Sequence, residues 1–168
     1  MKIDEFNNAI KSKITGAYEL KEDSDSYGNS NAWVILENKR DVEVVAKAIK
    51  AYKGRCVAAT AYKNEKENTH TVVYHFDING TIVNMQLVTD NQSVHSITPI
   101  LKSADWAERE MREMYDIEVL GHPCSDRLFL DYSLVKGVLN EYISLSKMQT
   151  GLSDTDVLWS KINKGAES

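Results

Sequence analysis

The stretch HTVVYHFDINGTIVNMQL, residues 70–87, decides the fold. Its centre, Asn79-Gly80, is the preferred dipeptide of a two-residue type I′ turn, so the flanking segments are predicted to form a β-hairpin. One face of that hairpin carries the pairs Val72–Leu87, Tyr74–Met85, Phe76–Val83 and Ile78–Thr81, in which seven residues are apolar. The opposite face carries the pairs Val73–Gln86 and His75–Asn84. The turn and the alternation agree, so the first face is predicted to lie on the core.

Hydrophobic periodicity predicts further strands and helices before and after this hairpin. Asp4 is a possible N-cap of the first helix, and Gly54 stands where the second helix should end. The predicted elements are a helix at 4–14, a polar loop at 22–31, a strand at 32–37, a helix at 40–54, a strand at 55–63, a polar run at 64–68 and an irregular or short extended segment at 91–100.

The C-terminal third adds two predicted helices. Ser103 is a predicted N-cap for a helix through about Tyr115, and helical spacing predicts another helix at 134–147. The order of elements predicts an α+β fold, a small mixed sheet with a β-meander in the C-terminal half of the chain and helices mainly on one face. Residues 1–131 are predicted to form this domain, and residues 132–168 a C-terminal helix with a flexible tail.

Composition excludes several function classes. The chain has 168 residues, a formal net charge of -5 and two cysteines. A nucleic-acid binder would need clustered Lys and Arg, and a zinc site or iron–sulfur cluster of its own would need more thiolates. The sequence contains neither an apolar signal peptide nor the roughly 18 apolar residues of a membrane span. A cytoplasmic protein is therefore expected, held at a membrane only through other chains.

Helical spacing divides the stretch ADWAEREMREMY, residues 104–115, between two faces. The apolar stripe is Ala104, Ala107, Met111 and Met114, and the adjoining face is Trp106, Arg109, Glu110 and Glu113. The pairs Asp105–Arg109 and Glu108–Arg112 have the favourable i,i+4 order, so a solvated surface helix is one interpretation. The other is a docking face, because Trp and Arg are enriched at the centres of protein interfaces.

A catalytic interpretation has less support. Glu110 and Glu113 could perform acid–base work, and with His122 they could bind a metal, but no HExxH, GxSxG, P-loop or GxGxxG motif is present. His70 and His75 are five residues apart on one strand, so they face opposite sides. The sequence GHPCSDR, 121–127, is typical of a turn in which His122 bonds its own loop and Arg127 pairs with a helix carboxylate.

These residues resemble the 30-kilodalton subunit family of respiratory complex I, over about residues 70–130. The resemblance lies in VVYHF, in VHSITPILKSADWAERE and in EMYDIEVLGHP. The matching positions of the family signature are Trp106, Glu108, Arg109, Glu110, Glu113, Met114, Tyr115, Ile117, Gly121, His122 and Pro123. Asp116 replaces the usual Gly and His95 the usual Pro, and the family's extended C-terminal tail is missing. The form EREMREMY also looks like the related subunits of energy-converting nickel–iron hydrogenases and formate hydrogenlyase.

The resemblance implies a non-catalytic subunit that clamps the large catalytic subunit in the hydrophilic arm of a complex I-like oxidoreductase. It implies no cofactor in this chain, with iron–sulfur clusters and the nickel–iron or quinone site in partner subunits, and a place at the inner face of the cell membrane through those partners. The residues expected to form or brace the partner-facing surface are Trp106, Glu108, Arg109, Glu110, Glu113, His122 and Arg127. The alternatives are a stand-alone metal-dependent hydrolase using Glu110, Glu113 and His122, and a free regulator that has lost its complex.

Overall fold

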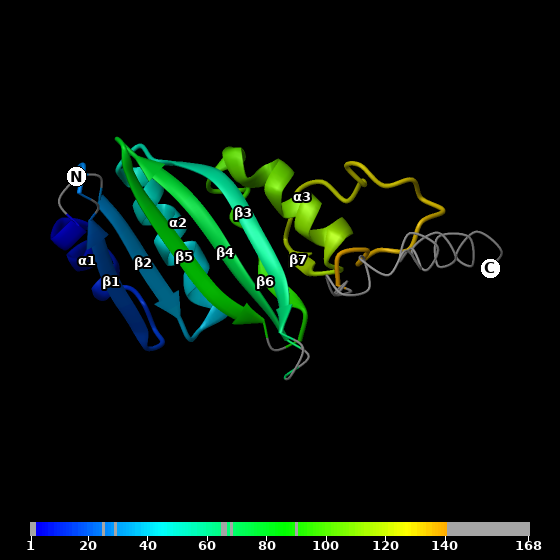
Figure 1. Cartoon of the computed structure of the whole chain (residues 1–168), viewed down its shortest axis with the longest axis horizontal. Coiled ribbons are helices and arrows are strands. Elements are labelled where there is room, and N and C mark those ends of the chain that lie inside the picture. Colours follow the sequence, from blue (N-terminus) through cyan, green and yellow to red (C-terminus); the bar gives the residue numbers. More distant parts are fainter. Residues whose placement is uncertain are drawn as a thin grey trace.

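The computed structural model describes residues 3–140, apart from 25, 29, 65, 66, 68 and 90. Figure 1 shows the arrangement of the elements. In chain order they are α1 (Ile3–Lys11), β1 (Tyr18–Ser24), β2 (Ser30–Leu36), the 3₁₀ turn η1 (Lys39–Asp41), α2 (Val42–Ala51), β3 (Arg55–Asn64), β4 (Thr69–Ile78), β5 (Thr81–Thr89), β6 (Ser93–His95), the 3₁₀ turn η2 (Lys102–Ala104), α3 (Asp105–Met114) and β7 (Glu118–Leu120).

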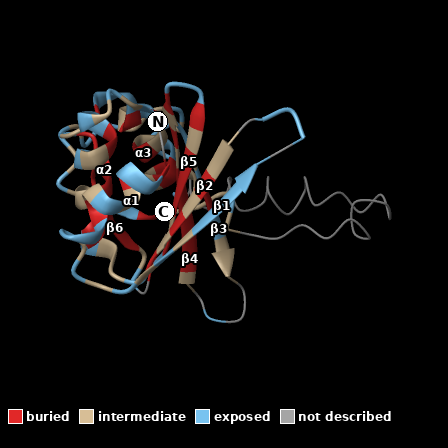
Figure 2. Ribbon diagram, turned by 90° about the vertical axis from the view of Figure 1, so that its left-hand side faces the viewer, coloured by how far each residue is buried: buried red, intermediate tan, exposed pale blue. Residues whose placement is uncertain are grey.

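The strands form one large and one small sheet. The large sheet has the order β1-β2-β5-β4-β3, and within it β2 and β5 are parallel while the other neighbours are antiparallel. Strands β6 and β7 form a short parallel pair. The three α-helices lie on one face of the large sheet (Figure 2). The prediction of an α+β fold with a mixed sheet, a meander of β3, β4 and β5, and helices on one face is confirmed.

The predicted hairpin forms in the predicted register. Ile78 pairs with Thr81 and Tyr74 with Met85, while His75 pairs with Asn84 on the opposite face. All eight residues of the predicted inner face are buried. Both turn residues have positive φ, 52° at Asn79 and 84° at Gly80, as a type I′ turn requires.

Helix α2 ends by a different device from the predicted one. The left-handed residue after the helix is Lys53, with φ 57°, and not Gly54. Gly54 is needed for space, since a Cβ there would lie 2.8 Å from side-chain carbons of both Ile49 and Ile78. At the N-terminus of the chain, Asp4 is in the first turn of α1 and is not its N-cap.

The prediction of a polar loop at 22–31 is wrong at both ends. Strand β1 continues to Ser24 and β2 begins at Ser30. Strand β1 is the edge of the large sheet, and its exposed side chains Glu19, Lys21 and Glu22 are polar. Charged side chains are typical of edge strands because they discourage pairing with other chains, and they also hide the strand from a search for apolar alternation.

The predicted N-cap Ser103 has another role. It lies within η2, and its hydroxyl accepts a hydrogen bond from the backbone N–H of Cys56 at 2.9 Å. The residue before α3 is Ala104, which makes no capping bond with its side chain. After the helix, Asp116 adopts φ 54°, the left-handed conformation that the family's glycine would adopt easily. Asp tolerates that region better than most residues, so the helix still ends there.

The predicted helix at 134–147 does not form over residues 134–140. Gly137 has φ 80°, and the backbone N–H groups of Gly137 and Leu139 donate to the carbonyl oxygens of Glu113 and Met114. These N–H groups are therefore engaged with α3 and not with a helix of their own. Residues 141–147 lie outside the described part of the chain, as does the rest of the predicted tail.

Candidate functional site

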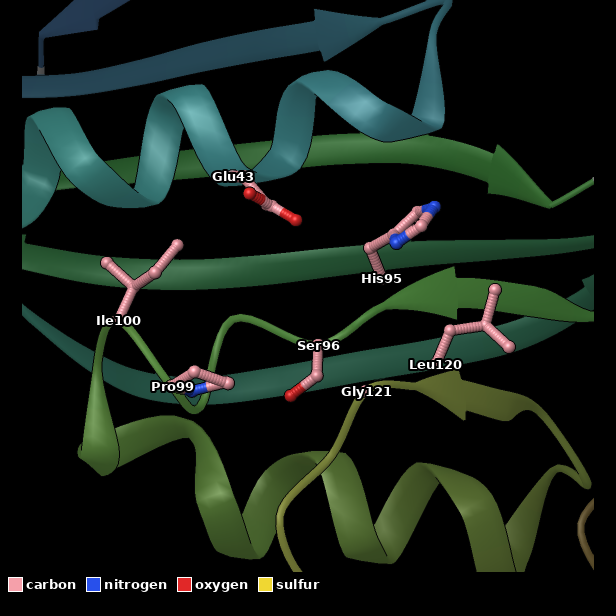
Figure 3. Close-up of a pocket in the computed structure, with 7 residues that line it drawn as sticks. All are labelled: Glu43, His95, Ser96, Pro99, Ile100, Leu120 and Gly121. Carbon is pink, nitrogen blue, oxygen red and sulfur yellow. The ribbon is translucent and has the colours of Figure 1, made fainter.

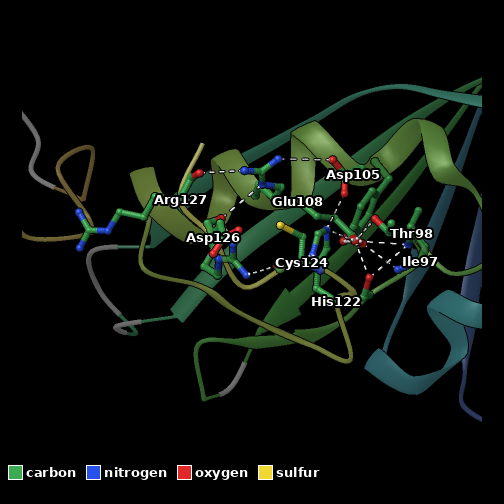
Figure 4. A network of polar contacts seen from close by, with 12 residues as sticks. Ile97, Thr98, Asp105, Glu108, His122, Cys124, Asp126 and Arg127 are labelled. Atoms are coloured by element: carbon green, nitrogen blue, oxygen red, sulfur yellow. Dashed lines mark hydrogen bonds and ion pairs between the residues drawn. The ribbon is translucent and has the colours of Figure 1, made fainter. Parts of the chain in front are cut away.

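Glu108 is the centre of a buried polar network on the sheet-facing side of α3 (Figure 4). Its side chain is fully buried. Its carboxylate accepts hydrogen bonds from the backbone N–H groups of Ile97 and Thr98 at 2.7 and 3.3 Å and from the phenol of Tyr74 at 3.1 Å. The hydroxyls of Ser96 and Thr98 add two bonds of 2.6 Å each. Glu108 thus joins α3 to β4 and to the loop after β6.

This network raises the pKa of two neighbouring groups. Burial, and then the charge and hydrogen bond of Glu108, raise the pKa of Tyr74 well above its ordinary value. Burial, and then the charge of Glu108, raise the pKa of Cys56 to about 12. A thiol with such a pKa stays protonated at neutral pH, so Cys56 is not a nucleophile.

His122 completes the network from the turn after β7. Its side chain is only 2% exposed, and its Nε2 lies 3.5 Å from Asp105 Oδ1 and 3.8 Å from Glu108 Oε2. Its Nδ1 lies 2.8 Å from the carbonyl oxygen and 3.1 Å from the backbone nitrogen of Cys124, so the predicted bond of His122 to its own loop is confirmed. Nε2 makes no hydrogen bond with the described residues.

Two arginines of α3 hold the segment that follows. We call residues 124–140 the strap. Arg109 donates from Nη2 to the carbonyl oxygen of Arg127 at 2.8 Å, and Arg112 donates to the carbonyl oxygens of Cys124 and Asp126 at 2.8 and 2.6 Å. The predicted pair Asp105–Arg109 is present at 3.8 Å. The predicted pair Glu108–Arg112 is not, because Glu108 turns to the core and Arg112 to the strap.

The side chain of Glu113 binds the backbone of the strap. Its buried carboxylate accepts hydrogen bonds from three successive N–H groups, those of Leu128, Phe129 and Leu130, the last two at 2.9 Å. Burial raises the pKa of Glu113, but the three amides and the charge of Arg127 lower it, and the balance leaves that pKa below its ordinary value. The charge of Arg127 acts on Glu113, but the guanidinium itself donates to the backbone carbonyl oxygens of Asp131 and Leu134, within the strap.

The strap then covers the C-terminal end of α3. Gly137 N–H donates to Glu113 O at 2.8 Å and Leu139 N–H to Met114 O at 2.9 Å. The amide of Asn140 donates to Tyr115 O at 2.8 Å, and its oxygen lies 2.7 Å from Nε2 of the buried His70. These bonds satisfy carbonyl groups that a helix end leaves unpaired.

Several apolar side chains of the strap are exposed although its backbone is held. Trp106 on α3 is 65% exposed and meets Phe129 edge to face, with ring centroids 6.2 Å apart. The guanidinium of Arg127 lies 5.5 Å from the ring centre of Tyr132. The exposed apolar side chains of this surface, which we call the docking face, are Trp106, Phe129, Tyr132, Val135 and Leu139.

The structure sorts the predicted site residues into two groups. Trp106 and Glu110 are exposed, while Glu108, Arg109, Glu113, His122 and Arg127 are engaged with their own chain. Of the predicted apolar stripe, Ala104 and Met111 are buried and Ala107 and Met114 only partly so. Sequence reasoning missed the exposed strap residues: it gave Phe129 and Tyr132 no role and expected a helix at 134–147 around Val135 and Leu139.

The described residues offer no support for a metal-dependent hydrolase. They contain no group of three or more His, Cys, Asp and Glu side chains placed to hold a metal ion. Glu113 faces the strap amides, His122 faces Asp105, and Glu110 faces solvent. Likewise, no helix among residues 3–140 is both long and apolar enough to cross a membrane.

Comparison with known proteins decides the family. The family model described as "Respiratory-chain NADH dehydrogenase, 30 Kd subunit" matches residues 35–147. The chain belongs to this family. It is 41% identical to the C subunit of NADH-quinone oxidoreductase from Caulobacter sp. (strain K31) over 71 residues, and 46% identical to the same subunit from Sinorhizobium medicae (strain WSM419) over 43 residues. These matches cover 40% and 26% of this chain. They span only 33% and 21% of the relatives' own length.

Two solved structures share the fold of this 30 Kd subunit family member. The trypsin-resistant fragment 1–134 of Nqo5 matches with a TM-score of 0.57 and 19% identity, over 74% of this chain and 99% of that fragment. A chain of the membrane-bound sulfane sulfur reductase, an archaeal respiratory membrane complex, matches with a TM-score of 0.64 and 13% identity. That match covers 89% of this chain and 91% of the other. At these identities the likeness establishes the fold alone.

Proposed function

We propose that this chain is a non-catalytic docking subunit in the hydrophilic arm of a membrane-associated complex I-like oxidoreductase, of the energy-converting hydrogenase or NADH dehydrogenase type. It clamps the large catalytic subunit through the docking face. The iron–sulfur clusters and the nickel–iron or quinone site belong to the large and iron–sulfur partner subunits. The chain lies in the cytoplasm at the inner face of the cell membrane, where those partners hold it.

One observation carries the proposal: the strap is fixed by its backbone and exposes the side chains of Phe129, Tyr132, Val135 and Leu139. Residues 128–130 give their N–H groups to Glu113, yet Phe129 is 57% and Tyr132 73% exposed. A segment that only completed its own core would turn such side chains inward, since burying an aromatic side chain stabilises by a few kcal/mol. Exposed aromatic rings on a segment with a hydrogen-bonded backbone instead suit burial against a second protein.

The predicted interface residues have two roles in this account. Trp106 and Glu110 touch the partner. Glu108, Arg109, Glu113 and His122 brace the surface, because their side chains connect α3 to the loop after β6, to the turn at 121–123 and to the strap. Arg127 braces the strap internally, through the carbonyl oxygens of Asp131 and Leu134. Preorganised surfaces bind more tightly because less conformational entropy is lost on association.

Substitution of Trp106 tests the proposal. Trp106→Ala should weaken co-purification with the large subunit from solubilised membranes by about 2 kcal/mol, roughly 30-fold, as for an interface hot spot. Tyr27→Ala is the matched control, because Tyr27 is a 90% exposed aromatic residue between β1 and β2, which lie across the sheet from α3 (Figure 1). An equal yield of complex from Trp106→Ala and wild type would refute the assignment of this face.

A further inference from the structure

A second feature of the surface lies outside the docking face. A cavity of about 340 Å³ opens between α2 and the loops after β6 and β7, and Figure 3 shows its lining side chains. They are Glu43, His95, Ser96, Pro99, Ile100, Leu120 and Gly121. None of these residues belongs to the docking face, so the cavity is a separate feature of the surface.

The polar side of the cavity is acidic. The Glu43 carboxylate extends from α2 into the space (Figure 3). Its described partner is Lys47, at 3.2 Å, and with side chains 64% and 44% exposed this i,i+4 pair contributes little and can open. Opposite, the Ser96 hydroxyl is bonded at 2.6 Å to Glu108, so a second, buried carboxylate lies directly behind the cavity wall.

The rest of the wall is apolar. Pro99, Ile100 and Leu120 supply it, and His95 adds an imidazole that carries no charge when neutral. An anionic guest would face the carboxylates of Glu43 and Glu108, which like-charge repulsion disfavours. An aliphatic guest would displace water from the Glu43 carboxylate without offering it a hydrogen bond or a charge. A long basic side chain matches both parts, because it places a hydrocarbon stem on apolar surface and a cation at the end.

We propose that this cavity takes a lysine or arginine side chain from a partner subunit, with its stem against Ile100 and Leu120 and its cation on Glu43. The identity of the donor as a subunit of the complex rests on the proposed function. The chemistry of the cavity rests only on its own residues. The basic side chain replaces Lys47 as the partner of Glu43, and Lys47 turns to solvent.

Single side chains probe the cavity without the complex. Nα-acetyl-arginine methylamide is titrated into the full-length chain, and backbone amide shifts of Ile100 and Gly121 are followed by NMR. Binding with a Kd of roughly 1 mM is expected. Nα-acetyl-citrulline methylamide has the same shape without the charge, and it should bind at least about threefold more weakly, the size of an exposed charge pair.

Three variants assign the effect to Glu43. Glu43→Gln should remove the preference for arginine over citrulline, and Lys47→Gln should strengthen arginine binding because it removes the internal competitor. Glu22→Gln, an exposed change on edge strand β1 outside the cavity, should leave binding unchanged. Equal binding of arginine and citrulline by the wild type, or an undiminished preference in Glu43→Gln, overturns the proposal. Neither result bears on the Trp106→Ala experiment, so the cavity proposal and the proposed function can be disproved independently.

Discussion

The carboxylate of Glu113 on α3 accepts the backbone N–H of Leu130 at 2.9 Å, across 17 residues of chain. The two preceding N–H groups converge on the same carboxylate. A side chain of the helix therefore fixes the backbone of the strap, and the strap's own side chains remain available. This one relationship links the fold to the docking face.

Glu113→Gln should release the strap without unfolding the domain. The side-chain NH₂ of the new glutamine replaces an acceptor oxygen opposite the backbone N–H groups of the strap. The free energy that attaches the strap to α3 should therefore fall by about 1–3 kcal/mol. Hydrogen exchange at residues 128–130 should accelerate by roughly 5- to 150-fold, as that free energy requires, while β4 and β5 keep their protection. Glu110→Gln on the exposed side of α3 is the control. Unchanged exchange at 128–130 in Glu113→Gln would contradict the attachment.

The attachment should also depend on pH. The pKa of Glu113 is lower in the folded chain than its ordinary value of 4.5, so ionised Glu113 stabilises the strap fully above that value. The stabilisation is lost as the pH falls through the folded pKa. NMR shifts of the Phe129 and Leu130 amides between pH 7 and pH 2 should titrate with a midpoint below 4.5. A midpoint above it, or the same titration in Glu113→Gln, would disprove the assignment.

The buried Glu108 should matter for global stability. Glu108→Gln places an N–H group among the five donors that surround the carboxylate, at a cost of about 3 kcal/mol or more. Tyr74→Phe removes one of these donors and should cost about 1 kcal/mol. The midpoint temperature of thermal unfolding should fall by about 2–4 °C for each kcal/mol of stability that is lost. Equal midpoints for the two variants would contradict the network described here.

Arg109 should affect assembly more than folding. Arg109→Ala removes donors to the carbonyl oxygens of Asp126 and Arg127, while Glu113 still holds residues 128–130. We expect at least a tenfold loss of co-purification with the large subunit and a free energy of unfolding within about 1 kcal/mol of wild type. Arg55→Ala on β3 is the matched control, because this guanidinium is 71% exposed and pairs only with Asp77 among the described residues. A complex as abundant as the wild type would count against the bracing role.

Local chemistry was enough to predict the central part of the fold. The Asn79-Gly80 turn and the alternation on either side of it specify a register in which every predicted pair is observed. These signals are reliable because the turn geometry and the burial of one face act on the same few residues. Edge strand β1 was missed for the opposite reason, since one side of it has no neighbour and its side chains are charged.

The roles of the charged residues could be predicted only in part. Helical spacing placed Glu108 beside Arg112 on a solvated face, but the donors that draw Glu108 inward come from residues 96–98, in a loop that has no periodicity. The strap was missed because Val135 and Leu139 fit a helical pattern, whereas Gly137 and the carbonyl groups at the end of α3 favour another conformation. Long-range hydrogen bonds of this kind produce no periodic pattern of residues in the sequence.

Photo-crosslinking from position 106 tests the central claim most directly. Trp106 is replaced by p-benzoyl-phenylalanine, which keeps an aromatic ring at the docking face, and membranes that contain the complex are irradiated. The account predicts a covalent product with the large catalytic subunit, identified by mass spectrometry, and none from the same probe at position 27. A probe at position 106 that reacts only with solvent or with its own chain, in membranes where the complex is intact, would contradict it.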